Sequence, residues 1–157
     1  MEPFLGSWQL ETSENFDNVL KELGVGFLTR QVYRISKPTF TVSRLEGCKY
    51  KMRSESTFKT TEFEFKLGEE FEEETPDGRT VKSTITIKGG TLKQVQVGEK
   101  TTYIDRVVEG NQLKTVSHLH PNFHHPPAFS CLQTPFFISV QVVQVGDVVS
   151  TRIYVKI

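Results

Sequence analysis

Residues 81–87, Val-Lys-Ser-Thr-Ile-Thr-Ile, alternate in polarity and lie between two turn signals, Asp77-Gly78 and Gly89-Gly90. Alternation in a run rich in β-branched residues predicts a strand with one face against a core. Residues 62–66 alternate in the same way. Turn signals recur at intervals of about ten residues from Gly68 to Gly110, after a longer gap from Gly47 that can hold two strands and a turn near Glu55. Many short, evenly spaced strands predict an all-β, up-and-down meander that closes into a barrel and so removes its edges.

Helical periodicity is convincing in two stretches only, residues 13–24 and 27–34. In the first, apolar side chains recur at the helical spacing, Ser13 or Asn15 can cap the start, and Gly24 can end the helix. A short first strand, residues 6–10, precedes them. We therefore expect two helices, inserted between the first strand and the remaining strands, to cap one end of the barrel.

The composition limits the classes of function. A chain of 157 residues is long enough for one domain with a core of its own. Its 19 basic and 19 acidic residues cancel, which gives no electrostatic argument for nucleic acid or an anionic membrane as the main partner. Two cysteines do not make a disulfide framework, and no signal peptide or stretch of about 20 apolar residues is present. These features predict a cytoplasmic protein.

The last strand, residues 146–157, raises a question about its orientation. Successive side chains point to opposite faces of a strand, so Arg152 and Tyr154 share one face and Val149, Ile153 and Val155 share the other. By alternation alone, the apolar face would lie against the core and Arg152 would lie in solvent.

The regular spacing of turn signals ends at residues 110–146. The next turn signal after Gly110 is Gly146-Asp147, 36 residues further on, where about ten are expected. All four histidines and four of the seven prolines lie here, and no charged residue occurs between Lys114 and Asp147. The composition of this stretch differs from that of the rest of the chain.

Residues 6–23, GSWQLETSENFDNVLKEL, closely resemble the signature of the cytosolic fatty acid-binding proteins. The likeness continues through GVGFLTR (24–30), KP (37–38), residues 54–71, 76–92 and 104–110, and GDVVSTRIYVKI (146–157). The resemblance implies a ten-strand β-clamshell, which is lipocalin-like, with a helix-turn-helix lid. It also implies a single domain over residues 1–157 that holds one or two long-chain fatty acids in an internal, water-containing cavity.

The resemblance also assigns roles to residues. The family holds the ligand carboxylate with two arginines and a tyrosine, and the matching positions are Arg106, Arg152 and Tyr154. A guanidinium forks onto a carboxylate and a phenol adds a third donor. Phe16 and Leu20 of the first helix are expected to face the cavity. The remaining positions expected to line the cavity or its portal are Val25, Thr29, Pro38, Phe58 (as a gate), Pro76, Asp77 and Arg79.

Residues 116–141 are predicted to be an insert in the domain. Deleting them leaves a join, Asn-Gln-Leu-Lys-Thr followed by Val-Val-Gln-Val-Gly-Asp, that continues a family strand and hairpin. Val116-Ser117 can be encoded GTA-AGT, a splice donor, and residues 136–141 can be encoded as a pyrimidine tract ending in CAG. We therefore interpret the segment as a translated intron. We predict residues 138–145 as the penultimate strand, because a short turn joins them to the last strand, and we expect residues 116–137 to loop out.

Other roles for the insert have weaker support. His118, His120, His124 and His125 could bind a metal ion, but prolines disrupt their spacing and only Cys131 lies nearby to complete a site, so we predict no metal. A membrane- or partner-binding loop around Phe129 and residues 136–138 is similarly weak, and the remaining interpretation is a functionless excursion.

The predicted function is therefore binding and transport of a long-chain fatty acid by a monomer, with transient membrane contact through the helical lid. A carrier of retinoic acid or another hydrophobic carboxylate remains an alternative, because such ligands carry the same headgroup. A non-functional isoform that retains an intron is a third. No catalytic set of Ser, His and Asp or of Cys and His, and no Gly-rich phosphate loop, supports an enzyme, and no cofactor is expected.

Overall fold

The computed structural model describes residues 1–120 and 148–157. After the 3-10 turn η1 (Glu2–Phe4), strand β1 (Gly6–Glu14) leads into α1 (Phe16–Glu22) and α2 (Phe27–Ile35). The other strands are β2 (Thr39–Arg44), β3 (Tyr50–Glu55), β4 (Thr60–Phe65), β5 (Glu70–Glu74), β6 (Thr80–Lys88), β7 (Thr91–Val97), β8 (Thr101–Glu109), β9 (Gln112–His120) and β10 (Val148–Lys156).

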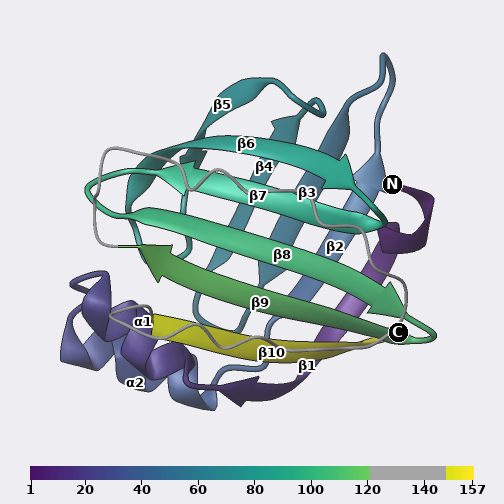
Figure 1. Cartoon of the computed structure of the whole chain (residues 1–157). Coiled ribbons are helices and arrows are strands. Elements are labelled where there is room, and N and C mark those ends of the chain that lie inside the picture. Colours follow the sequence, from purple (N-terminus) through teal and green to yellow (C-terminus); the bar gives the residue numbers. More distant parts are fainter. Residues whose placement is uncertain (121–147) are drawn as a thin grey trace, which may run out of the picture.

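The ten strands form one antiparallel sheet that curls into a nearly closed barrel. Their order is β4-β3-β2-β1-β10-β9-β8-β7-β6-β5, so β4 and β5 are the two edges. The edges meet through side chains: Phe63 of β4 stacks on Phe71 of β5 with ring centroids 5.0 Å apart. The helices lie together at one end of the barrel and η1 lies at the other (Figure 1). The predicted ten-strand, up-and-down barrel with two helices is confirmed.

Helix α1 begins differently from the expectation. Asn15 occupies the N-cap position, but neither it nor Ser13 makes a side-chain cap hydrogen bond. Asn15 has left-handed backbone angles, with φ of 58°, and its amide donates to the carbonyl oxygen of Val149 at 2.6 Å. Asparagine adopts this conformation more readily than most residues. Its side chain therefore joins the start of the lid to the last strand.

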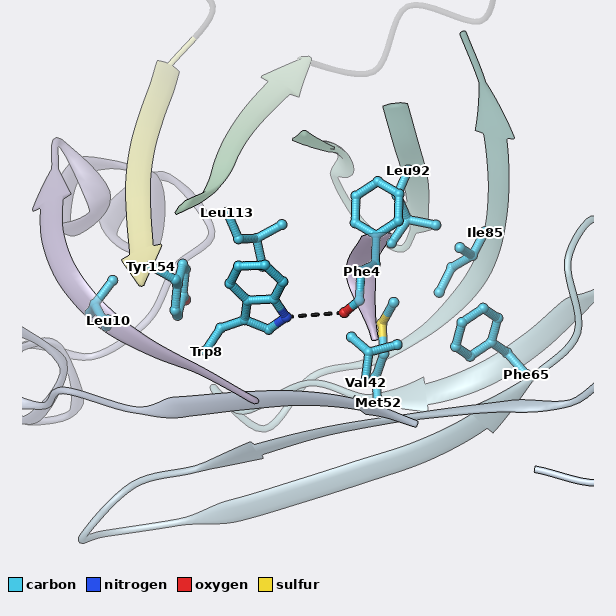
Figure 2. Packing of buried hydrophobic residues seen from close by; sticks show 10 residues of the cluster. All are labelled: Phe4, Trp8, Leu10, Val42, Met52, Phe65, Ile85, Leu92, Leu113 and Tyr154. Carbon is cyan, nitrogen blue, oxygen red and sulfur yellow. Dashed lines mark hydrogen bonds between the residues drawn. The ribbon is translucent and has the colours of Figure 1, made fainter. Parts of the chain in front are cut away.

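A hydrophobic cluster fills the end of the barrel near η1. Figure 2 shows ten of its side chains directed into the same space, among them Trp8, Leu92 and Leu113, which are fully buried. The indole N–H of Trp8 donates to the carbonyl oxygen of Phe4 at 3.0 Å, which satisfies the only polar atom of that side chain. Since burial of a large apolar side chain contributes about 1.5–3 kcal/mol, this cluster anchors the fold.

Inward-facing positions become polar away from this cluster. On β7, Leu92 belongs to the core, whereas Gln94 and Gln96 on the same face are also buried. On β10, Tyr154 and Ser150 are buried and Arg152 lies between them on the same face. The sequence alternation alone had placed Arg152 in solvent, and that prediction is wrong, because a polar interior occupies this part of the barrel.

The predicted exchange of the penultimate strand is also wrong. Gln112–His120 forms β9 and pairs with both β8 and β10, so residues 116–120 lie in the sheet and do not loop out. The β8–β9 connection consists of Gly110 and Asn111 alone, and Leu113 and Leu119 alternate inward to fully buried positions. A two-residue turn and a matching inward pattern therefore place residues 112–120 in this position. Residues 138–145, the predicted occupant, lie outside the described residues.

Candidate functional site

The two arginines of the predicted headgroup site flank one residue of β9. Thr115 is the cross-strand partner of Arg106 in β8 and of Arg152 in β10. Side chains directly opposite one another share a face of the sheet, so both guanidinium groups belong to the interior. Adjacent strands are about 4.8 Å apart, which separates the two backbones by roughly 10 Å. Long arginine side chains can converge over that distance.

Aromatic rings support both guanidinium groups. The Arg106 guanidinium carbon lies 5.1 Å from the ring centroid of Phe40, and that of Arg152 lies 4.3 Å from Phe16 and 5.4 Å from Tyr154. Contact with a ring face uses the π surface of the guanidinium, whereas its N–H donors point outward in the plane. This arrangement leaves donors available to a carboxylate.

Arg106 is the more deeply buried of the two, with 9% of its surface exposed. Burial lowers the pKa of its guanidinium, Tyr154 and Glu73 act in the opposite direction, and Arg152 lowers the pKa further. The group remains protonated, because the guanidinium of arginine is not deprotonated in proteins. A buried cation that is not ion-paired gains strongly from an anion placed beside it.

The sequence did not predict a hydrogen-bond network that lies behind Arg106. The guanidinium donates to Oε1 of Gln94 at 2.8 Å, and the amide of Gln94 donates to the carboxylate of Glu73 at 2.7 Å. Gln96 (3.0 Å) and the hydroxyl of Ser83 donate to the same carboxylate. Strand parity could have indicated these residues, because Gln94 and Gln96 share the inward face of β7 with Leu92, but polar inward positions do not by themselves predict a site.

Several polar atoms at the site make no hydrogen bond within the described residues. They are Nε of Arg152 and the hydroxyls of Thr102 and Thr115, all buried. All three residues line the cavity. Buried polar atoms normally have a partner, supplied by protein, water or ligand. The site can therefore accept a polar headgroup or ordered water.

These residues belong to the wall of an internal cavity of about 140 Å³. Its polar wall includes Arg106, Arg152, Tyr154 and the network behind Arg106. Its apolar wall comes from the lid and the facing strands: Phe16, Val19, Leu20, Leu23, Phe40, Met52, Phe63 and Ile104. A cavity with one apolar wall and a few convergent polar groups suits an amphipathic ligand.

The structure brings together only part of the predicted portal. Phe16 and Leu20, on α1, line the cavity, as do Pro76, Asp77 and Arg79 in the β5–β6 connection. Asp77 and Arg79 form a close ion pair, with Nε to Oδ2 at 2.5 Å. The other predicted positions, Val25, Thr29, Pro38 and Phe58, are not on this wall. Pro38 is buried beside β1, where its carbonyl oxygen accepts from the backbone N–H of Leu10, and the side chain of Phe58 is largely exposed.

A second hollow, of about 560 Å³, lies outside the barrel between the two helices and β1. The ion pair between Asp17 of α1 and Arg30 of α2, at 2.7 Å, forms part of its wall. Phe16 and Leu20 contribute to both hollows, so α1 separates them.

Within residues 1–120 and 148–157, no group of three or more His, Cys, Asp or Glu side chains is placed to hold a metal ion. Two of the histidines considered above, His124 and His125, lie outside this range. Likewise, no helix in the part of the chain that the structure describes is long and apolar enough to cross a membrane.

Comparison with known proteins shows which family has this fold and site. Residues 5–117 match the model of the lipocalin / cytosolic fatty-acid binding protein family. Fatty acid-binding protein homolog 2 of Echinococcus granulosus is 56% identical over 115 residues, covering 73% of this chain and 86% of that protein. The chain belongs to the lipocalin / cytosolic fatty-acid binding protein family. Human fatty acid-binding protein 9 is 48% identical over 111 residues, with 69% and 83% covered.

Solved structures of fatty acid-binding proteins have the same architecture. The crystal structure of fatty-acid-binding protein 1 of E. granulosus superposes with a TM-score of 0.81 at 46% identity, covering 100% of this chain and 99% of that one. The fatty acid-binding protein of Schistosoma mansoni, in complex with arachidonic acid, superposes with a TM-score of 0.78 at 38% identity, covering 100% and 98%. The resemblance to this family that the sequence showed is confirmed.

Proposed function

We propose that this protein binds a long-chain fatty acid in its cavity and carries it through the cytoplasm, with the carboxylate held by Arg106, Arg152 and Tyr154. The observation that carries the proposal is the flanking of Thr115 by two inward arginines. Charge-assisted hydrogen bonds from guanidinium groups to a carboxylate are about twice as strong as neutral ones. Tyr154 lies beside both arginines on the same wall and can supply a third donor.

The acyl chain would extend along the apolar wall. Each buried methylene contributes about 0.8 kcal/mol, so a chain of roughly fifteen methylenes contributes on the order of 10 kcal/mol before the cost of ordering it. The arginines then determine orientation and select for an anionic headgroup. A complex of an S. mansoni relative with arachidonic acid supports a ligand of this class.

We place the entrance for the ligand at the helical end of the barrel. Val25, Thr29 and Phe58 would surround it, and the Asp77–Arg79 pair would lie at its inner rim. Exposed Phe27 and Leu28 at the start of α2 are suited to transient contact with a membrane that donates or accepts the ligand. The protein would act as a monomer.

Titration of the purified protein with a fluorescent fatty acid tests the proposal. We expect saturable binding by the full chain and a loss of at least tenfold in affinity for Arg152→Gln. Arg44→Gln removes a positive charge from an exposed surface position and should bind like the unmodified protein. Equal binding by Arg152→Gln and the unmodified protein would refute the anchor.

Displacement of the bound probe distinguishes the ligand classes. A retinoic acid carrier would release the probe to retinoic acid more readily than to a fatty acid, whereas both assignments predict weak competition by retinol, which lacks the carboxylate. Strong displacement by retinol would contradict the role of the arginines.

The same titration on a variant lacking residues 116–141 tests whether the full chain is a functional carrier. Binding by both chains supports the proposal for the full chain. Binding by the deletion variant alone would show that the full chain is an inactive form.

A further inference from the structure

The charges on the cavity wall do not cancel. Each of Arg53, Asp77 and Arg79 forms an ion pair. Three charged side chains of the wall have no ion-pair partner among the described residues: Arg106, Arg152 and Glu73. Two positive charges and one negative charge leave the interior with a net single positive charge, provided that Glu73 is ionised.

The surroundings of Glu73 suit the ionised form. Its residue is only 4% exposed, and its two carboxylate oxygens accept hydrogen bonds from Ser83, Gln94 and Gln96. Two amide donors and one hydroxyl face the group, and hydrogen bonds donated to a carboxylate favour its ionised form. Glu73 lies on the edge strand β5, and its partners lie on β6 and β7. The network therefore fixes the position of Glu73 and favours its negative charge.

Gln94 connects Glu73 to Arg106 through one hydrogen bond to each of them. Its amide nitrogen donates to Glu73, which fixes the amide orientation, so its oxygen points to Arg106 and accepts at 2.8 Å. Arg106 is thereby held beside a neutral acceptor, and a carboxylate that would neutralise it stays one residue further away. The guanidinium keeps its positive charge available to the cavity.

We infer that Glu73 is a positioning residue that sets the charge selectivity of the cavity: it restricts the headgroup to a single negative charge. This inference rests on the proposed binding of a carboxylate at Arg106 and Arg152. A monoanionic headgroup brings the interior to neutrality, whereas a dianion such as a phosphate monoester leaves one excess negative charge next to Glu73. Buried charge without compensation is unfavourable, so the dianion binds more weakly.

Paired titrations with hexadecanoate and hexadecyl phosphate at pH 8, where the phosphate is mostly a dianion, test this inference. We expect the unmodified protein to bind hexadecanoate at least about tenfold more tightly than hexadecyl phosphate, which is the effect of one unit charge at a separation of roughly 12 Å and an effective dielectric constant of about 20. In Glu73→Gln the ratio of the affinity for hexadecanoate to the affinity for hexadecyl phosphate should fall by roughly tenfold. Glu72→Gln, which removes the same charge from the neighbouring exposed position, should leave the ratio unchanged.

The outcomes separate this inference from the proposed function. If the unmodified protein binds neither ligand, the proposed function fails. If it binds hexadecanoate and a folded Glu73→Gln variant keeps the same ratio within twofold, Glu73 is only structural and the inference is overturned. If Glu73→Gln does not fold, the unmodified protein still decides, because equal or tighter binding of the phosphate ester contradicts the charge balance and a preference for hexadecanoate supports it.

Discussion

The guanidinium carbon of Arg152 lies 4.3 Å from the ring centroid of Phe16, so the last strand contacts the first residue of the lid through a cation and a ring. Phe16 in turn packs edge-on against Tyr33 of α2, with ring centroids 6.1 Å apart. The proposed headgroup site and both lid helices are thus linked by three side chains in contact. The energetic coupling between these side chains can be measured.

Phe16→Leu keeps an apolar side chain but removes the aromatic face. We expect it to lower the free energy of unfolding by about 1 kcal/mol, since cation–π contacts contribute about 0.5–2 kcal/mol according to their burial. Chemical denaturation of Phe16→Leu, Arg152→Gln and the double variant gives the coupling energy. A coupling energy of zero would mean that the contact makes no net contribution.

Leu119→Ala tests the assignment of β9. Leu119 is 2% exposed, so truncation should cost about 2–5 kcal/mol in the free energy of unfolding. Val149→Ala, on the outward face of the neighbouring strand and 38% exposed, should cost much less. Similar, small effects of both substitutions would show that residues 116–120 do not occupy the sheet.

Asn15→Ala and Asn15→Gly separate two contributions at the start of the lid. Both variants lose the hydrogen bond to Val149 and the one that Asn15 accepts from the side-chain amide of Asn18, each worth about 0.5–1.5 kcal/mol. Glycine adopts a φ of 58° without strain, whereas alanine is strained there at a further cost of about 1–2 kcal/mol. Thermal unfolding should therefore rank the original protein first, glycine second and alanine last. A glycine variant less stable than alanine would contradict this account.

The raised pKa of Tyr33 predicts that the protein loses stability as the pH rises in the alkaline range. Burial, and to a smaller extent Asp77, raise the pKa of its phenol to about 12 against the opposing effect of Arg152 and Arg79. Since the unfolded value is about 10, the folded state retains the proton in this interval and the unfolded state loses it. The stabilisation that neutral Tyr33 provides is complete below about pH 10 and declines as the pH rises toward 12.

Tyr33→Phe cannot ionise, so between pH 10 and 12 its stability should fall less steeply than that of the original protein. Denaturant unfolding at several pH values measures the difference, and comparison of the two proteins cancels the titration of the other three tyrosines. Parallel curves over this range would show that the pKa of Tyr33 is not raised.

Local pattern predicted both helices and most of the strands in this chain, but it did not identify the penultimate strand or determine which residues face inward in the polar half of the barrel. Helical spacing at residues 13–24 and 27–34 and alternation at residues 81–87 each reflect an apolar face against a core. At Arg152 the same signal is misleading, because the opposite face of its strand is the apolar one and alternation alone places the arginine in solvent. Only the family resemblance indicated its position correctly.

Glu73 illustrates a further limit of sequence reasoning. It lies in an acidic stretch, residues 72–74, whose members look alike in sequence, yet Glu73 is buried while Glu72 and Glu74 are exposed. The difference arises from Ser83, Gln94 and Gln96, which come from two other strands and satisfy the carboxylate. Such partners become adjacent only when the register of the sheet is known.

The prediction about the penultimate strand failed for a related reason. Both residues 112–120 and residues 138–145 alternate in a way compatible with one position in the sheet. The short sequence signal Gly146-Asp147 favours residues 138–145, whereas the observed two-residue connection at Gly110-Asn111 joins residues 112–120 directly to β8. The buried Leu119 shows which segment forms the ladder with β8 and β10.

The pairing of Leu119 with Val148 has a consequence for the gene. If residues 116–141 were removed, Val145 would take the position of Leu119, and Gly146-Asp147 alone would connect it to Val148. A two-residue loop that begins with glycine matches a type II′ β-hairpin, a favoured connection between antiparallel strands. A deletion one codon longer or shorter would shift the strand residues that follow the join by one position, and their inward side chains would then point outward. We therefore propose that one messenger RNA encodes this chain and that a second, spliced messenger RNA encodes a barrel closed by that hairpin. Sequencing of transcripts across the Thr115 codon should show both forms. If no transcript skips the segment, the spliced form does not exist.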